Sequence, residues 1–183
     1  MSLAKIVDYL VQAGERVTNA VRVITTDHAA IHEGQGFSIT GIFAAVANAS
    51  VVNYAFKTPT AASGKYVHLK FRDIVATANK IRVDFYEAPT AAPTNGTDLV
   101  PYNRRRIGTP TATAMQAVKV SMDLDLTGAT MIDSTQFIGG VARPLDIEFV
   151  LKPDTWYIRT FTNSTGAAAD ITFIEFWYEE LAG

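Results

Sequence analysis

The sequence contains no cysteine, which excludes disulfides, thiol catalysis and zinc sites built on thiolates. Charged residues make up only 19% of the 183 residues, below the roughly 25% of ordinary soluble domains. The formal net charge is −2, so the chain lacks the basic excess that marks nucleic-acid-binding proteins. No apolar run approaches the roughly 20 residues of a membrane-spanning helix. We therefore expect neither nucleic acid nor a membrane as a partner.

Hydrophobic residues make up 48% of the chain, enough to bury the core of one domain. From about residue 25 onward, apolar and polar side chains alternate in successive segments, as in an antiparallel sheet with one buried face. These segments are 37–42, 66–72, 81–87, 118–126, 145–152, 156–161 and 171–178. Turn signals separate them and no helical pattern intervenes, which predicts an all-β, antiparallel, jelly-roll-like sandwich over residues 25–183.

In residues 1–24 the apolar side chains recur with a different spacing. Leu3, Ile6, Val7, Leu10 and Val11 recur at the spacing of one helix face, which predicts a short N-terminal helical arm. Because so short a helix is marginal in isolation, its apolar stripe needs a partner. That partner is either the chain's own domain or another subunit.

The densest group of candidate metal ligands is His28, His32 and Glu33. Histidines at i and i+4 bind metal when a helix places both on one face. Gly34 and Gly36 follow at once, and the flanking residues indicate strand and turn instead. We therefore expect these residues to form hydrogen bonds at the entry to the sheet, and we expect no metal or cofactor.

Other catalytic patterns are weak. Asp123 and Asp125 lie two residues apart on an expected strand face, but glycoside hydrolysis needs two carboxylates facing each other across a cleft. The chain contains no phosphate-binding loop and no nucleophile elbow. We expect no catalytic residues and no enzymatic activity.

The one cluster of like charges is Arg104-Arg105-Arg106, which follows Tyr102 and Asn103. Three arginines can hold phosphate, but single-strand readers spread basic residues along a groove with several aromatics. A solvated loop is one alternative. The other is a loop that pairs with carboxylates of a neighbouring subunit, for which the planar guanidinium is well suited.

The order of several segments resembles a known family. Asp27-His28, then Ile31 to Gly34, leads into the first alternating segment, and the later segments are 85–89, 101–104, 148–152, 156–159 and 176–179. This succession resembles tailed-bacteriophage virion structural proteins of the head decoration or cement type. The likeness spans about residues 25–180 and leaves the N-terminal segment poorly matched.

The resemblance implies a β-sandwich subunit without an active site, made in the bacterial cytoplasm and placed on the outer surface of the phage head. Its expected partners are further copies of itself, as a homotrimer, and the major capsid protein. The interface residues that we expect are Leu3, Ile6, Val7, Leu10, Tyr102, Arg104, Arg105 and Arg106. The alternative is a carbohydrate-binding or tail-associated module, with Trp156, Tyr157, Trp177 and Tyr178 as its aromatic platform.

Overall fold

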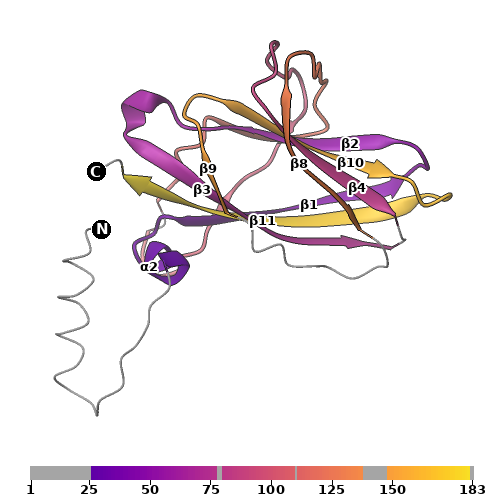
Figure 1. Cartoon of the computed structure of the whole chain (residues 1–183). Coiled ribbons are helices and arrows are strands. Elements are labelled where there is room, and N and C mark those ends of the chain that lie inside the picture. The colour runs from indigo at the N-terminus through magenta and orange to yellow at the C-terminus, as the bar shows by residue number, and fades with distance from the viewer. Residues whose placement is uncertain (1–25, 78–79, 110, 138–147, 182–183) are drawn as a thin grey trace.

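The computed structural model describes residues 26–77, 80–109, 111–137 and 148–181. Two antiparallel sheets pack face to face (Figure 1), which confirms the predicted all-β sandwich. The expected N-terminal arm, with Leu3, Ile6, Val7 and Leu10, lies outside the described residues.

The two sheets have the following strands, in spatial order. The five-stranded sheet contains β6 (Tyr102–Asn103), β1 (Gly36–Val46), β11 (Ala169–Leu181), β3 (Lys65–Ala76) and β9 (Glu148–Leu151). The six-stranded sheet contains β5 (Thr97–Asp98), β7 (Ala117–Val120), β2 (Val51–Lys57), β10 (Trp156–Asn163), β4 (Ile81–Glu87) and β8 (Thr130–Phe137). Two short helices accompany them, α2 (Thr26–His32) and the 3-10 helix η1 (Ala61–Ser63).

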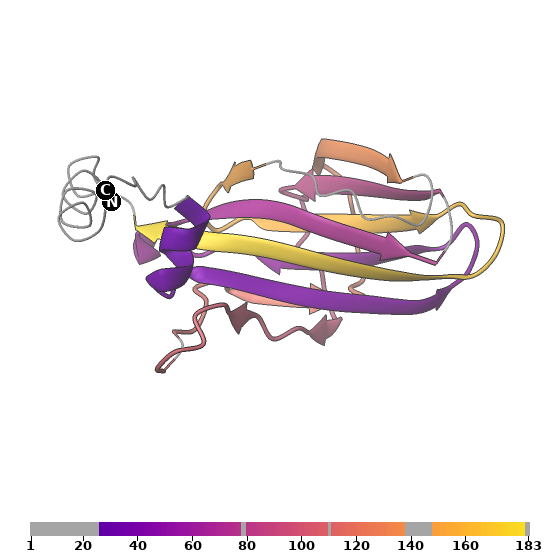
Figure 2. The ribbon, with the colours of Figure 1, turned by 90° about the horizontal axis from the view of Figure 1, so that it is seen from below.

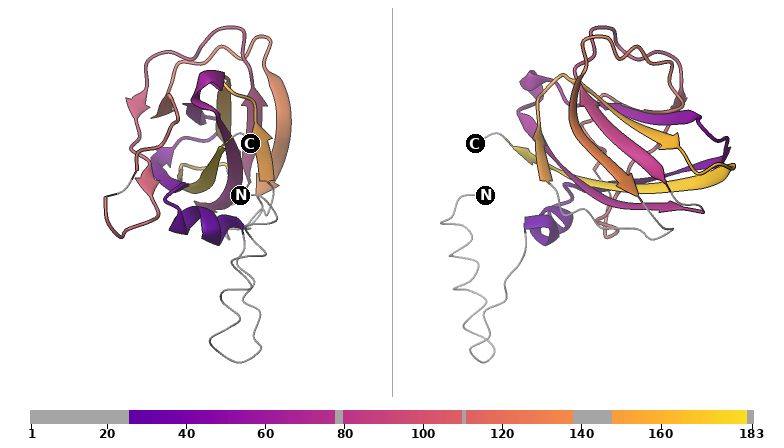
Figure 3. Two further views of the ribbon diagram at one scale, coloured as in Figure 1. Left: turned by 90° about the vertical axis from the view of Figure 1, so that its left-hand side faces the viewer. Right: turned by 45° about the vertical axis from the view of Figure 1, so that its right-hand side comes forward.

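The strand order is that of a jelly roll. Without β5, β6 and β7, the remaining strands lie in the orders β1-β11-β3-β9 and β2-β10-β4-β8. Along the chain they alternate between the two sheets, except that β4 is followed by its own neighbour β8. These are two interlocked Greek keys. The three short strands belong to an insertion, residues 88–129, that joins β4 to β8. In Figure 3 part of this insertion rises above the strands, and another part runs down to the opposite side of the sandwich, where β6 pairs with β1. The predicted jelly-roll character is thus confirmed.

One predicted strand was partly wrong. The alternating segment 118–126 stays in the sheet only to Val120, where β7 ends. Ser121 then adopts a positive φ of 54°, which turns the chain out of the strand. The apolar residues that follow do alternate, but they pack on the outside of the sheet.

Aromatic rings fill the space between the sheets. Phe173 of β11 lies 5.7 Å from Phe43, 5.1 Å from Tyr54 and 5.3 Å from Phe161, measured between ring centroids. Gly41 makes room for this cluster, because a Cβ at that position would lie 2.2 Å from the Phe173 ring. These ring contacts join strands of both sheets and form the centre of the core.

An ion pair also crosses the core between the sheets. The Arg159 Nη2 of β10 lies 2.7 Å from the Glu175 Oε1 of β11, and both side chains are almost completely buried. The guanidinium carbon lies 4.2 Å from the centre of the Phe85 ring, a cation–π contact. Burial raises the pKa of Glu175, and Arg159 opposes that shift. Burial, then the neighbouring Glu175, raises the pKa of the Tyr54 phenol well above its usual value.

Breaking this ion pair from one side leaves a buried charge without its partner. We expect Glu175→Leu or Arg159→Met alone to lower the free energy of unfolding by about 3–5 kcal/mol. The double variant replaces the pair by apolar side chains and is expected to recover most of that loss. Urea denaturation of the three variants measures this difference, and equal losses in the single and double variants would contradict it.

Candidate interaction surfaces

The outer face of the six-stranded sheet is covered by the chain's own insertion. Met122 packs on Ala55 of β2 and Ile158 of β10, and Leu124 and Leu126 lie partly buried beside them. The buried amide of Asn53 fastens this segment, since it donates to the Met122 carbonyl and accepts from the Met122 N–H, both at 2.8 Å. The insertion therefore covers Ala55 and Ile158 on this face, while Val51 of β2 and Met131 of β8 stay half exposed.

A second part of the insertion is fixed at one end of the sandwich by Glu179. This buried carboxylate accepts hydrogen bonds from the Thr113 hydroxyl and the Ala114 N–H. Its other oxygen lies 2.9 Å from the Lys65 Nζ. We call the segment with Arg104, Arg105 and Arg106 the arginine loop. The connection that follows this loop is anchored to β11 and β3 by these contacts.

The outer face of the five-stranded sheet is covered at one end by α2 (Figure 2). Ala30 and Ile31 pack on Phe176 and Tyr178 of β11. Gly36 permits this close approach, because a Cβ there would lie 2.9 Å from the Ile31 Cγ1. The sequence did not predict this helix.

The strand-and-turn conformation expected for this segment was wrong, but the helix still joins the two histidines by a hydrogen bond at the entry to the sheet, as expected. The Nε2 atoms of His28 and His32 lie 2.7 Å apart and share a hydrogen bond. Glu33 follows the last helical residue and is exposed. In the described part of the chain, no group of three or more His, Cys, Asp or Glu side chains is arranged to hold a metal ion.

Beside α2, an ionic cluster occupies the same sheet face. His68 stacks on Tyr178, with ring centroids 4.5 Å apart, and its two nitrogens lie 2.9 Å from Glu148 and 3.1 Å from Glu180. Lys70 lies 3.2 Å from Glu148, and the Tyr178 hydroxyl donates to the same carboxylate. Burial raises the pKa of Glu148, but hydrogen bonds from Tyr178, His68 and Lys70 outweigh it and bring the pKa below 4.5.

The rest of this sheet face carries exposed apolar side chains next to Asp73 of β3, which pairs with Ile174, and no described element covers it. Ile42 of β1, Ile174 of β11 and Val75 of β3 are 69%, 37% and 46% exposed. Thr40 and Thr172 complete the patch, because Thr40 pairs with Ile174, while Thr172 pairs with both Ile42 and Val75. We call these five uncharged side chains the open face. In Figure 2 this stretch of β1, β11 and β3 faces the viewer.

The open face ends at a sheet edge. Among the described residues, β6 pairs with β1 only at Phe37 and Ser38, so β1 has no further neighbour on that side. The strand ends its pairing at a bulge, where Ala45 has a φ of 49° and its N–H donates to Asp170. Bulges limit the pairing of sheet edges with other chains.

The open face is the part of the candidate site that sequence reasoning missed. Ile42, Val75 and Ile174 stand at outward positions, where the alternation of a half-solvated strand favours a polar residue. That interruption of the pattern was the available signal.

The predicted interface loop lies close to α2 and is exposed. The Arg104 guanidinium carbon lies 4.8 Å from the centre of the Phe176 ring, and the Arg105 side chain passes Gly34. Tyr102 is exposed, whereas Asn103 is buried and donates to the carbonyls of Gly34 and Thr111. Within the described ranges, no carboxylate pairs with Arg104, Arg105 or Arg106. The loop therefore presents its positive charge outward.

The aromatic residues considered for sugar binding do not form an exposed platform, because each is wholly or partly covered. Tyr157, Trp177 and Tyr178 are buried, and Trp156 packs in the cluster with Met122.

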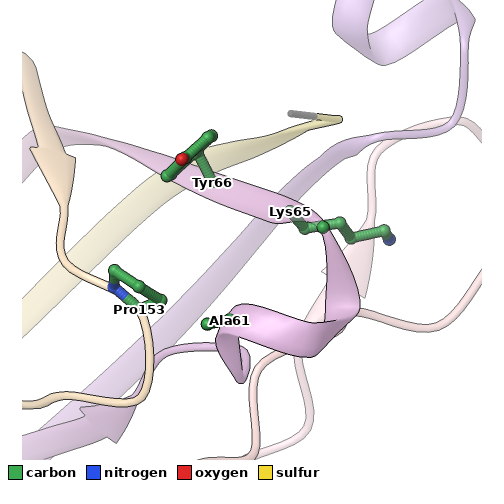
Figure 4. Close-up of a pocket in the computed structure, with 5 residues that line it drawn as sticks. Ala61, Lys65, Tyr66 and Pro153 are labelled. Carbon is green, nitrogen blue, oxygen red and sulfur yellow. The ribbon is translucent and has the colours of Figure 1, made fainter. Parts of the chain in front are cut away.

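A small depression of about 60 Å³ is lined by Ala61, Gly64, Lys65, Tyr66 and Pro153 (Figure 4). It is far below the roughly 300–1,000 Å³ of ligand pockets.

The predicted acidic pair is not set across a cleft. Asp123 accepts a hydrogen bond from the Asn95 side chain, and Asp125 accepts one from the Thr127 N–H. Hydrogen bonds from Thr127 lower the pKa of Asp125. Both side chains are exposed.

No protein-family model matches the chain, and no curated protein sequence is significantly similar to it. None of the described helices is long and apolar enough to cross a membrane.

The ionic cluster predicts a response to acid. Because the pKa of Glu148 is lowered in the folded state, its carboxylate stabilises the fold above pH 4.5, and this contribution is lost as the pH falls through the folded-state value. Glu148→Gln should therefore be less stable than the wild type at pH 7 and lose less stability on acidification to pH 3. Urea midpoints across this range measure the difference, with Glu33→Gln as the exposed control. Parallel curves for wild type and Glu148→Gln would contradict the prediction.

Proposed function

We propose that this protein is a non-enzymatic virion structural protein of a tailed bacteriophage, a homotrimeric decoration or cement protein on the outside of the head. The open face carries the proposal, because an uncovered apolar sheet face on a stable sandwich is suited to binding protein. On this proposal the chain is made in the bacterial cytoplasm and joins the major capsid protein on the virion.

The contrast between the two outer faces supports assembly. On the six-stranded sheet, Met122 and its neighbours cover Ala55 and Ile158, so this chain does cover apolar strand surface with its own residues. The five-stranded sheet leaves Ile42, Val75 and Ile174 exposed side by side. Jelly rolls build both viral capsid proteins and sugar-binding domains, so the surface, not the fold, favours the first.

The arginine loop supplies the second contact. Arg104, Arg105 and Arg106 present charge without an internal carboxylate partner among the described residues. Guanidinium groups form paired hydrogen bonds with carboxylates, so an acidic surface of a neighbouring subunit or of the capsid is the matching partner. A trimer multiplies such modest contacts through effective concentration.

Attachment to heads tests the proposed function. The protein is co-expressed with the major capsid protein of the same phage, and assembled heads are sedimented. The proposal predicts that it sediments with the heads at a fixed ratio and raises their resistance to heat. Recovery only in the supernatant would refute it, and specific binding on a glycan array would favour the carbohydrate-binding alternative.

The arginine loop makes a prediction about salt. Replacing Arg104, Arg105 and Arg106 by alanine should weaken attachment to heads by about tenfold or more, since it removes three interfacial charges. Wild-type binding should weaken as salt rises, and binding of the variant should depend on salt less steeply. Binding isotherms at several salt concentrations measure both effects. Wild-type affinity in the variant would remove the loop from the interface.

A further inference from the structure

The open face has the dimensions of a helix-binding surface. It crosses three neighbouring strands, β1, β11 and β3, whose spacing makes it about 10 Å wide between the outer strands. A helix with its side chains is about 10–12 Å across. The same sheet already holds a helix at its other end, where Ala30 and Ile31 lie on Phe176 and Tyr178.

The chain itself contains a segment of matching chemistry. Leu3, Ile6, Val7 and Leu10 form one apolar helix face in the sequence. The open face would receive them on Ile42, Val75 and Ile174, with Asp73 at the β3 position opposite Ile174. At 1.5 Å per residue, a helix over residues 3–11 is about 13 Å long. Such a short helix needs a surface on which to bury its stripe.

The position of α2 allows residues 3–11 to reach an open face. The described chain begins at Thr26, in the helix that lies on the same outer face. Residues 12–25 join the apolar stripe to it, and extended chain of that length spans up to about 50 Å. A linker of this length lets the apolar stripe extend beyond its own sandwich.

We propose that residues 3–11 of one copy dock, as a helix, on the open face formed by Thr40, Ile42, Thr172, Ile174 and Val75 of the next copy. This inference rests on the proposed function, because assembly places a second open face within reach. Each copy then gives one arm and receives one, a head-to-tail contact that closes into a ring.

The absence of cysteine allows a direct test. The full-length variant Leu10→Cys/Ile42→Cys is oxidised mildly and examined on a non-reducing gel. The inference predicts covalent dimers and trimers, and nothing larger. The control pairs Leu10→Cys with Met131→Cys, a half-exposed position on β8 of the other sheet, and should cross-link at least tenfold more slowly. Equal yields from both pairs, or products formed only within single chains, would overturn the inference.

A second variant tests the same contact without cross-linking. Ile42 is 69% exposed, so Ile42→Asp should leave the sandwich folded while it repels the apolar stripe. Trypsin should then cut at Arg16 and Arg22 severalfold faster than in the wild type, and Met131→Asp should show the wild-type rate. Unchanged cleavage in Ile42→Asp would count against the docking site.

The two proposals fail in different ways. A protein that sediments with heads but does not cross-link through Ile42 would refute the arm exchange and leave the decoration function standing. A protein that forms the cross-linked trimer but never binds heads would refute the function and leave the exchange standing.

Discussion

The structure depends on one constraint, which is that each sheet of a sandwich has two faces and the partner sheet covers only one. The inner faces meet around Phe173, Tyr54 and Phe161, and the Arg159–Glu175 pair links the two sheets within that core. A buried ion pair is costly to desolvate, and a partner charge is what makes each member tolerable there. The partner sheet does not cover the outer faces, and different segments of the chain pack on each of them.

That difference leads from the fold to the proposed function. The insertion between β4 and β8 covers β2 and β10 on one outer face by placing Met122 on Ala55 and Ile158. The other outer face receives only α2 among the described elements, so β-branched side chains beyond the ionic cluster stay exposed. Exposed apolar surface on this scale is costly to an isolated subunit and useful to an assembling one. The exposed guanidinium groups of the arginine loop make such a contact specific for a partner surface that carries carboxylates.

Sequence alternation predicted the strands that have one buried face, such as β1, β3, β4 and β11. It missed β2, because residues 53–56 are buried on both faces of the sheet and the strand shows no alternation of apolar and polar residues. It extended β7 too far, because Met122 and Leu124 alternate while lying on the sheet. It could not predict which outer face stays uncovered, since that depends on where a distant insertion packs. The glycines after His32 also concealed α2, although they only end that helix.

The central claim is that the open face holds this protein's copies together. Light scattering of the full-length protein and of Ile42→Asp measures it most directly. With a chain mass of 19.9 kDa, the account predicts a mass near three chains for the wild type and near one chain for the folded variant. A wild-type monomer, or a trimer unaffected by Ile42→Asp, would contradict it.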